Sequence, residues 1–428
     1  MACCRERPRF LAAARSDTRF PRCCKGQNQG LDWELQEGTR IGNWVSREGM
    51  TTPSFAMKVY DYQWATTHGM EPSRAADELA RDGVDTVLVR NQIDPLPTSG
   101  VDQDAYLAAA SLGRDIDQRW STALREAGRV VYQTTALFFE PSALATFPDA
   151  RPISADGRPE RGFDWYRGIC PTHEGFLQAK VERLRRVTAE LEPDGLFLSF
   201  TRFPGFWENW VPEYRFTDAD RFCFCDRCRN AFAAAHDLDL PAGETASQAR
   251  WILDHHGAEW DAWRAARVGE AISRIAAAAR QVRPDLTILL NTLPFPRSEF
   301  AGSDVRRAIA AQDLAVLRGV VDRFELMTYL QILDRPDAWL APVVADARHD
   351  VPDRPLLCTL QVAPLYTTGV HAGRGRATEI SAESLAGSAR AALAAGADGL
   401  VFYHWTDFLE DEAAGGRKRE VLREVARG

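Results

Sequence analysis

The sequence predicts an α/β fold: a single (β/α)8 barrel with long insertions after the third and fourth strands. From residue 54 onward, eight short apolar runs alternate with helical, Ala- and Arg-rich stretches, without a long gap between the pairs. The runs are apolar at successive positions, as expected for parallel strands covered on both faces. The stretch after the first run, "YDYQWATTHG", has no glycine-rich phosphate turn, so an open doubly wound sheet fits less well.

The expected strands cover residues 54–62, 84–92, 129–140, 194–204, 286–295, 323–332, 355–364 and 398–408. Helical periodicity predicts helices over 72–83, 173–193 and 381–396, the last of which ends at Gly396, a typical C-terminal cap. Two joints between a helix and a strand, "LEPDGLFL" and "AAGADGLVF", share an Asp-Gly pair, which predicts a tight turn into the strand.

Two segments are too long to be simple connections. Residues 141–173 extend the loop after the third strand, and residues 205–285 follow the fourth strand with a cysteine-rich stretch and a long helix over 246–282. Long loops at the carboxyl ends of barrel strands are where binding sites are usually built. We therefore expect function at this end of the barrel.

Residues 1–49 differ from the rest of the chain. They hold two Cys-Cys pairs and scattered arginines but no sustained apolar period. They could form a basic arm with metal-binding cysteines, but their composition favours a disordered extension or a mistaken start, with Met50 or Met57 as the natural beginning. The barrel is then expected to occupy residues 50–428.

Composition excludes several classes of partner. The 428-residue chain is 45% hydrophobic with a net charge of −8, so it has no basic surface for nucleic acid. It contains no run of eighteen apolar residues and no secretory signal, so we expect a cytoplasmic protein without a membrane partner. In that reducing compartment, clustered cysteines indicate metal ligands rather than disulfides.

Three cysteines crowd the segment "FCFCDRCRNAF" at 222–232, where a helix is expected over 226–236. Cys223, Cys225 and Cys228 would supply three thiolates, and Cys170 is the expected fourth ligand because the loops after neighbouring strands lie side by side. A closed four-cysteine site predicts structural zinc that does not activate water.

Alternatives for the cysteine cluster stay open. His173 and Asp226 are weaker substitutes for a cysteine ligand, and the three clustered thiols could instead pack as apolar side chains. Cys358 lies within an expected strand among Leu and Thr and is interpreted as a core residue.

The cluster also carries a resemblance. An upstream cysteine followed by "CFCDRCRNAF" resembles the zinc cluster of the β-galactosidases of glycoside hydrolase family 42, which lies in the loop after strand four of a (β/α)8 barrel. The runs "PDGLFLSFTRFPGFWENW", "FELMTYLQ" and "LVFYHW" resemble strands four, six and eight of glycosidase-like barrels. The resemblance covers residues 54–428 and implies a carbohydrate substrate and no organic cofactor. Barrels of this kind often associate, so a homo-oligomer fits the expectation.

Glycoside cleavage requires two carboxyl groups. The strand ends offer Glu208, the preferred general acid beside Trp207 and Arg202, with Asp61 or Asp407 as its partner and Glu140 as a further candidate.

The positions where the resemblance places acidic residues hold Ser199 and Gln361 instead. This keeps open a catalytically impaired carbohydrate-binding barrel. A sugar isomerase or lyase is a third reading, but it would need histidine and carboxylate metal ligands, and the chain has only 8 histidines.

Sugars present apolar C–H faces and a rim of hydroxyls, so aromatic and bidentate polar side chains at strand ends are expected to bind them. The candidates are Trp64, Arg90, Asn91, Arg202, Trp207, Asn291, Tyr329, Gln361, His404 and Trp405.

Overall fold

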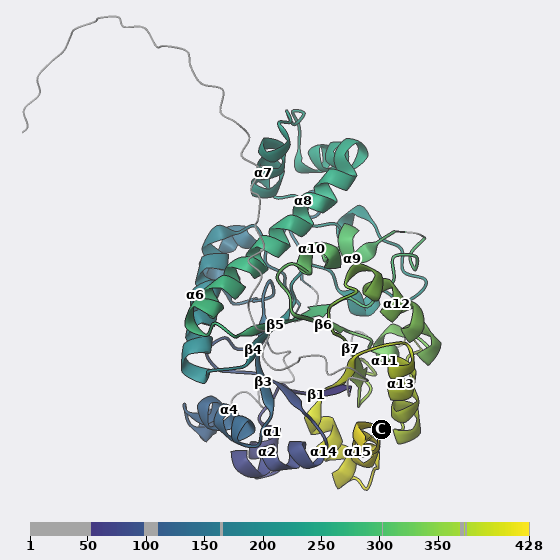
Figure 1. Ribbon diagram of the computed structural model, residues 1–428. Helices are drawn as coiled ribbons and strands as arrows, with labels where there is room; N and C mark the ends of the chain where they lie inside the picture. Colours follow the sequence, from purple (N-terminus) through teal and green to yellow (C-terminus); the bar gives the residue numbers. More distant parts are fainter. Residues whose placement is uncertain are drawn as a thin grey trace, which may run out of the picture. The chain divides into compact units, whose positions relative to one another are not determined.

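The computed structural model describes residues 53–97, 110–162, 166–301, 303–368, 372 and 375–427. Eight parallel strands form a closed barrel in which each strand pairs with the next and β8 pairs with β1, which confirms the predicted fold (Figure 1). The strands are β1 Ser54–Val59, β2 Thr86–Val89, β3 Val130–Ala136, β4 Gly195–Ser199, β5 Thr287–Thr292, β6 Arg323–Leu326, β7 Leu356–Gln361 and β8 Gly399–Tyr403. The expectation for residues 1–49 lies outside the described part.

Every expected strand is present, but each is shorter than the apolar run that predicted it. The run 194–204, for example, contains β4 only as far as Ser199. The apolar residues beyond it, such as Phe203, are buried outside the sheet by the loops at the mouth. Burial by loops therefore extends the hydrophobic signal past the end of the strand.

Helices surround the barrel and fill its connections. The described α-helices are α1 Gln63–Thr66, α2 Pro72–Arg81, α4 Ile116–Glu126, α5 Ala143–Thr146, α6 Glu174–Leu191, α7 Asp226–His236, α8 Thr245–Val282, α9 Val305–Ala308, α10 Leu314–Leu317, α11 Leu330–Leu333, α12 Leu340–Asp350, α13 Ala382–Ala394, α14 Trp405–Ala413 and α15 Lys418–Arg427. Among the described segments, no helix has both the length and the apolar character that a membrane span requires.

The two Asp-Gly pairs stand at the short joints where α6 leads into β4 and α13 leads into β8, and they also serve the packing of the strands. A Cβ atom on Gly195 would lie 2.2 Å from the ring of Tyr132, and one on Gly399 would lie 2.2 Å from the Ser54 carbonyl oxygen. The carboxylates of Asp194 and Asp398 accept hydrogen bonds from the N–H groups of Val131, the second residue of β3, and Leu356, the first residue of β7, at 2.9 and 2.8 Å. In each pair the glycine allows the neighbouring strands to pack closely, and the aspartate accepts a hydrogen bond from a backbone amide at the start of the neighbouring strand.

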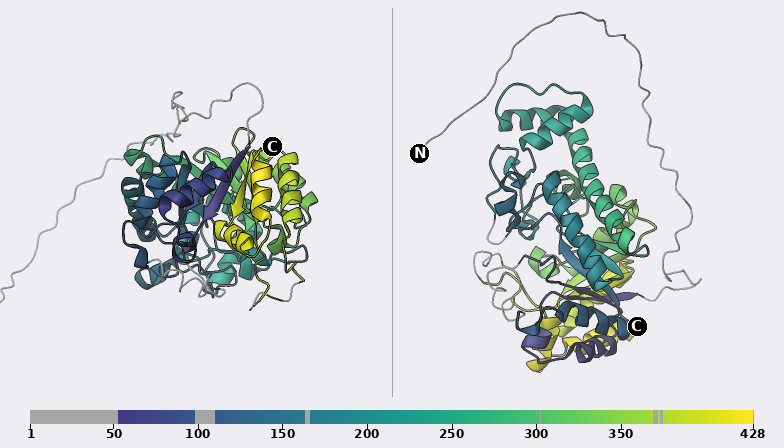
Figure 2. Two further views of the ribbon diagram at one scale, coloured as in Figure 1. Left: turned by 90° about the horizontal axis from the view of Figure 1, so that it is seen from below. Right: turned by 90° about the vertical axis from the view of Figure 1, so that its left-hand side faces the viewer.

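The second insertion is built on aromatic stacking. α7 and α8 match the helices expected over 226–236 and 246–282, and α8 is kinked at His256. Phe224, just before α7, stacks on Trp260 of α8 with ring centroids 4.7 Å apart. Figure 2 shows these teal helices extending beyond the ring of barrel helices. The stacking fixes the cysteine-bearing loop against α8.

Candidate active site and metal centre

The barrel interior changes from apolar to polar towards the carboxyl ends of the strands. One interior layer consists of Ala56, Leu88, Tyr132, Phe197, Leu289, Leu357 and Val401. Side chains two residues apart on a strand share a face. The next layer therefore contains Lys58, Thr134, Ser199, Asn291, Thr359 and Tyr403. This polar layer is the floor of the barrel mouth, where (β/α)8 proteins place their sites.

A buried ion pair occupies the centre of this floor. Lys58 of β1 donates to Glu325 of β6 over 2.7 Å, and both side chains are almost completely buried. Asn291 donates to the other carboxylate oxygen at 2.6 Å, and the Thr359 hydroxyl also donates to Glu325. Burial lowers the pKa of the Lys58 ammonium, an effect that Glu325 opposes. Side chains from three strands, β1, β5 and β7, thus donate hydrogen bonds to one carboxylate on β6.

Glu208 lies in the short 3-10 helix η4 (Trp207–Asn209) that follows β4. Its side chain is buried, and its Oε2 atom has no hydrogen-bond partner among the described residues. Burial raises the pKa of the Glu208 carboxyl to about 7, although Arg202 and Arg376 both favour the ionised form. A carboxyl that keeps its proton near neutral pH has the property required of a general acid.

Arg202 is held beside Glu208 by aromatic contacts. Its guanidinium donates to the Tyr166 hydroxyl and lies 4.9 Å from the centroid of the Phe200 ring. Tyr166 in turn donates to the carbonyl oxygen of Gly205 at 2.8 Å. These contacts hold the Arg202 guanidinium in one position at the mouth, and its role in binding stays a prediction.

Asp61 and Asp407 lie on either side of His404. The imidazole Nδ1 is 3.8 Å from an Asp61 oxygen, and Nε2 is 3.6 Å from an Asp407 oxygen. Thr406 donates to both oxygens of Asp61, at 2.9 and 2.8 Å. Burial raises the pKa of Asp407, and His404 opposes that change. The structure therefore brings three predicted site residues together at the end of β8.

Glu140 has a different environment from the other candidate acids. It forms ion pairs with Lys180 at 2.9 Å and with Arg183, both from α6. These partners overcome the effect of burial and lower the pKa of Glu140 to about 2. Because both oxygens are engaged and the group stays ionised, its geometry fits an anchor for α6 better than an acid catalyst.

Trp64 and Trp405, expected as sugar platforms, are completely buried. Each stacks on Trp120 of α4, with ring centroids 4.5 Å and 6.4 Å away. Neither ring presents a free face to a ligand, which contradicts the expectation for this pair. The sequence could not reveal that a tryptophan of α4 stacks on both of them.

The other predicted binding aromatics lie closer to the candidate acid. Trp207 directly precedes Glu208, and its ring centroid is 5.6 Å from that of Tyr329. The Tyr329 hydroxyl accepts a hydrogen bond from Lys58 at 3.0 Å, and Asn291 contacts Glu325. These three residues connect Glu208 with the polar floor.

Three further candidates make local bonds. Arg90 donates to the carbonyl oxygen of Tyr60 at 3.0 Å, and the Asn91 side chain accepts from the Asp94 amide at 2.7 Å. The Gln361 amide donates to the Gln331 side chain at 3.2 Å and accepts from a backbone amide of α11. Asn91 and Gln361 thus accept hydrogen bonds from backbone amides at the mouth and hold those segments in place.

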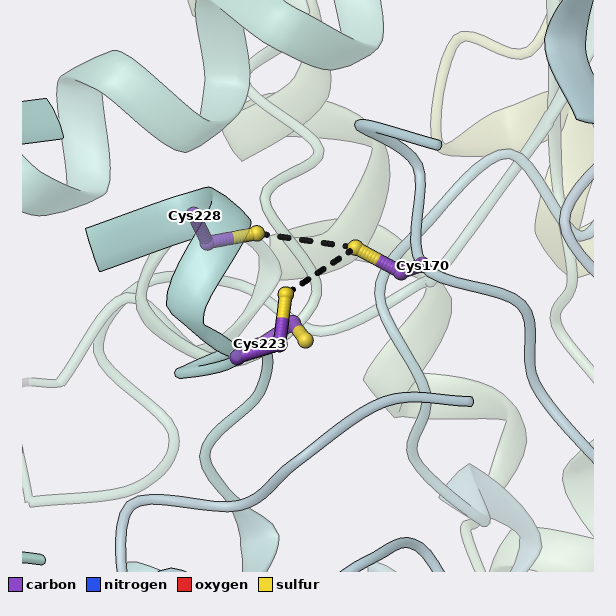
Figure 3. Close-up of side chains that lie close together, drawn as sticks. Cys170, Cys223 and Cys228 are labelled. Atoms are coloured by element: carbon purple, nitrogen blue, oxygen red, sulfur yellow. Dashed lines mark hydrogen bonds between the residues drawn. The ribbon is translucent and has the colours of Figure 1, made fainter. Parts of the chain in front are cut away.

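The four predicted cysteines form one cluster. All four Sγ atoms lie within 4.8 Å of one another, and the Cys170 sulfur is 3.5 Å from that of Cys228 and 3.9 Å from that of Cys225. Figure 3 shows Cys170, Cys223 and Cys228 gathered at the start of α7. Hydrogen bonds from the other three thiols lower the pKa of Cys225, whereas burial is the largest cause that raises the pKa of Cys223.

The geometry of this cluster fits a metal ion. Tetrahedral zinc with bonds of about 2.3 Å to sulfur places the sulfur atoms about 3.8 Å apart, close to the two separations above. Neither weaker substitute is part of the cluster: His173 caps α6 and bonds Asp149 at 3.1 Å, and Asp226 pairs with Arg229. Cys358 is buried in β7, as predicted.

Sequence reasoning missed Lys58 and Glu325. Both are charged residues flanked by apolar ones inside strand runs, in "FAMKVY" and "FELM". A charge within a run that is otherwise buried on both faces was a usable signal, because it must be paired. Their pairing across 267 positions could not be read from the sequence.

Comparisons with known proteins show the class of fold. The chain aligns with the glycoside hydrolase domain of PgaB (BpsB) from Bordetella bronchiseptica at 15% identity and a TM-score of 0.61, covering 88% of this chain and 99% of that domain. With Gan42B, a family-42 β-galactosidase from G. stearothermophilus, it shares 11% identity at a TM-score of 0.57, and the alignment covers 88% of this chain and 57% of that enzyme. With α-L-fucosidase isoenzyme 2 from Paenibacillus thiaminolyticus it shares 14% identity at a TM-score of 0.51, and the alignment covers 88% of this chain and 48% of that enzyme.

The architecture is therefore the closed eight-stranded barrel found in these glycoside hydrolases, which confirms the expected resemblance. The chain spans about half the length of the two larger enzymes. No protein-family model matches the sequence, and no curated protein matches it.

Proposed function

We propose that the protein is a glycoside hydrolase that acts on a small glycoside or oligosaccharide at the carboxyl end of the barrel. The observation that carries the proposal is the buried Glu208 carboxyl, with a pKa raised to about 7 and an unbonded oxygen. Glu208 gives its proton to the glycosidic oxygen. The carboxylate of Asp61 or Asp407 either attacks the anomeric carbon or takes a proton from the attacking water.

The second candidate is a carbohydrate-binding barrel without hydrolysis. It is favoured by Ser199 at the end of β4 and by the amide of Gln361 on β7, because neither group is a carboxylate nucleophile. Both candidates share the carbohydrate ligand and differ in turnover.

The four cysteines are proposed to hold a structural zinc ion that ties the loop after β3 to the start of α7. The fit rests on the mutual sulfur distances. All four ligands would come from the protein, so such a site is closed and supplies rigidity rather than chemistry. A reducing compartment such as the cytoplasm would keep these thiols available, and a homo-oligomer remains part of the proposal.

The test uses the purified full-length chain with a panel of 4-nitrophenyl glycosides. We expect at least one glycoside to be turned over. For the phenyl glycoside of the same sugar, whose leaving group is poorer, Glu208→Gln should lower kcat by roughly 10²- to 10⁴-fold, the usual contribution of a general acid. Glu160→Gln is the matched control. Glu160 is also buried with a pKa raised to about 7, but it accepts a hydrogen bond from the Gly168 amide within the insertion after β3.

Equal activity of Glu208→Gln and wild type would remove Glu208 from the mechanism. Binding of a glycoside without turnover would support the second candidate.

A further inference from the structure

The ion pair of Lys58 and Glu325 has no evident need in the packing of the barrel. Replacing a buried ion pair by apolar side chains is often neutral or stabilising, because removing two charges from water costs free energy. The apolar layer one step below shows that this barrel accommodates apolar side chains at equivalent positions. The pair therefore suggests a role at the mouth.

The hydrogen bonds of Lys58 define the role of Tyr329. The Lys58 ammonium donates to Glu325 at 2.7 Å and to the Tyr329 hydroxyl at 3.0 Å. An ammonium group has three donors and no lone pair, so the tyrosine oxygen must be the acceptor. The hydroxyl proton of Tyr329 is then free for another acceptor, and no residue in the described part of the chain accepts it.

The surroundings place this hydroxyl at the candidate site. The ring of Tyr329 contacts Trp207 and Tyr403, with centroids 5.6 and 5.5 Å away. Tyr60 and Tyr403 are half-buried, and both rings lie within 6 Å of the Lys58 ammonium. Tyr329 thus lies against the polar floor of the barrel on one side and against Trp207, the residue before Glu208, on another.

We propose that Lys58 and Glu325 are positioning residues that hold Tyr329 as a hydrogen-bond donor to an acceptor oxygen of the ligand in the barrel mouth. A sugar hydroxyl or the glycosidic oxygen has the required chemistry. The nature of the ligand rests on the proposed function, whereas the direction of the hydrogen bond rests on the geometry alone. Glu325 has two parts in this arrangement: it keeps Lys58 protonated, and it orients the ammonium towards Tyr329.

Neutron diffraction from deuterated crystals of the full-length protein tests the direction of the bond without any substrate. We expect three deuterons on Lys58 Nζ, none on the Glu325 carboxylate, and the Tyr329 deuteron directed away from Lys58. A neutral Lys58 that accepts the deuteron of Tyr329 would overturn the proposal, and so would a Tyr329 deuteron donated to a protein acceptor.

Kinetics test the consequence, with the 4-nitrophenyl glycoside that the panel shows to be turned over fastest. Tyr329→Phe should lower kcat/KM by roughly five- to ten-fold, as loss of one neutral hydrogen bond does. The double variant Lys58→Met/Glu325→Gln removes both charges at similar volume and should cause a similar loss. Combining it with Tyr329→Phe should add little further, because the three residues act as one unit.

Asp82→Asn is the control for neutralising a buried carboxylate. Asp82 is buried beside Arg419 at the end of α2, just ahead of the amino end of β2 and so at the end of the barrel opposite the mouth, and its variant should leave kcat/KM unchanged. Multiplicative losses in the combined variant, or an unchanged kcat/KM in Tyr329→Phe, would contradict the positioning role. If no glycoside is turned over, the proposed function fails, while the neutron map still decides the hydrogen bond.

Discussion

Three glutamates in the loops after β3 and β4 differ because their neighbours differ. Glu140 meets two cations and has a pKa of about 2. Glu160 and Glu208 are buried with fewer compensating contacts, and the pKa of each is raised to about 7. Only Glu208 is near the mouth residues Arg202 and Arg376. At the scale of a residue, the environment rather than the side chain selects the candidate acid.

The pKa of Glu208 predicts the pH dependence of activity. The acid must be protonated to act, so kcat/KM should fall about ten-fold per pH unit above about pH 7. A pH–rate profile between pH 5 and 9 measures this limb, and Glu208→Gln should lack it. A wild-type profile that stays flat from pH 6 to 9 would exclude Glu208 as the acid.

Glu140 predicts a pH dependence of stability. Its pKa is lowered from 4.5 to about 2 in the folded state, so its contribution is complete well above pH 4.5 and is lost as the pH falls towards 2. Glu140→Gln should lower the free energy of unfolding by roughly 3 kcal/mol at pH 7. Urea denaturation at pH 7 and pH 3.5 should give a smaller difference at the lower pH.

The control for this effect is Glu182→Gln, which breaks an exposed pair with Arg185 in the same helix. Exposed ion pairs contribute about 0–1 kcal/mol to the free energy of unfolding. A loss in Glu140→Gln no larger than in this control would contradict the anchoring role.

At the scale of elements, the cysteine cluster joins segments that the barrel alone leaves apart. Cys170 comes from the insertion after β3, and the other three cysteines come from the start of α7 and the loop before it. Arg264 of α8 also donates to the carbonyl oxygen of Phe222 at 2.6 Å, beside the cluster. A metal ion there would complete a junction between both insertions.

Removal of one ligand should therefore release the metal. We expect the full-length protein to contain one equivalent of zinc, and Cys225→Ser to lose it and to unfold at a lower Tm. Metal analysis together with calorimetry measures both effects. Cys358→Ala, which alters a buried cysteine of β7 outside the cluster, should keep the zinc. Full zinc occupancy and an unchanged Tm in Cys225→Ser would refute the four-cysteine site.

At the scale of the whole molecule, the barrel was predictable because its signal is repeated and local. Each strand is an apolar run of its own, and eight of them close the sheet. The cysteine cluster was predictable for a related reason: its ligands lie in loops after neighbouring strands. The sequence nominated Asp61, His404 and Asp407 only one by one, and closure of the barrel, which brings β1 beside β8, places them together.

Other parts of the site depend on contacts that no local pattern contains. Trp120 stacks on both Trp64 and Trp405 from a helix whose position the sequence did not indicate. Lys58 and Glu325 pair across the barrel from β1 to β6, strands that are not neighbours in the sheet. Sequence patterns show which face of a strand is buried, but not which opposite residue it meets.

The most direct test of the central claim measures kcat/KM for aryl glycosides that share one sugar but differ in the pKa of the departing phenol. A general acid matters most for the poorest leaving group, because that group most needs a proton in the transition state. The account predicts that the loss caused by Glu208→Gln grows steeply with phenol pKa and nearly vanishes for the most acidic phenol. An equal loss across the series would show that Glu208 does not protonate the leaving group, and would contradict the account.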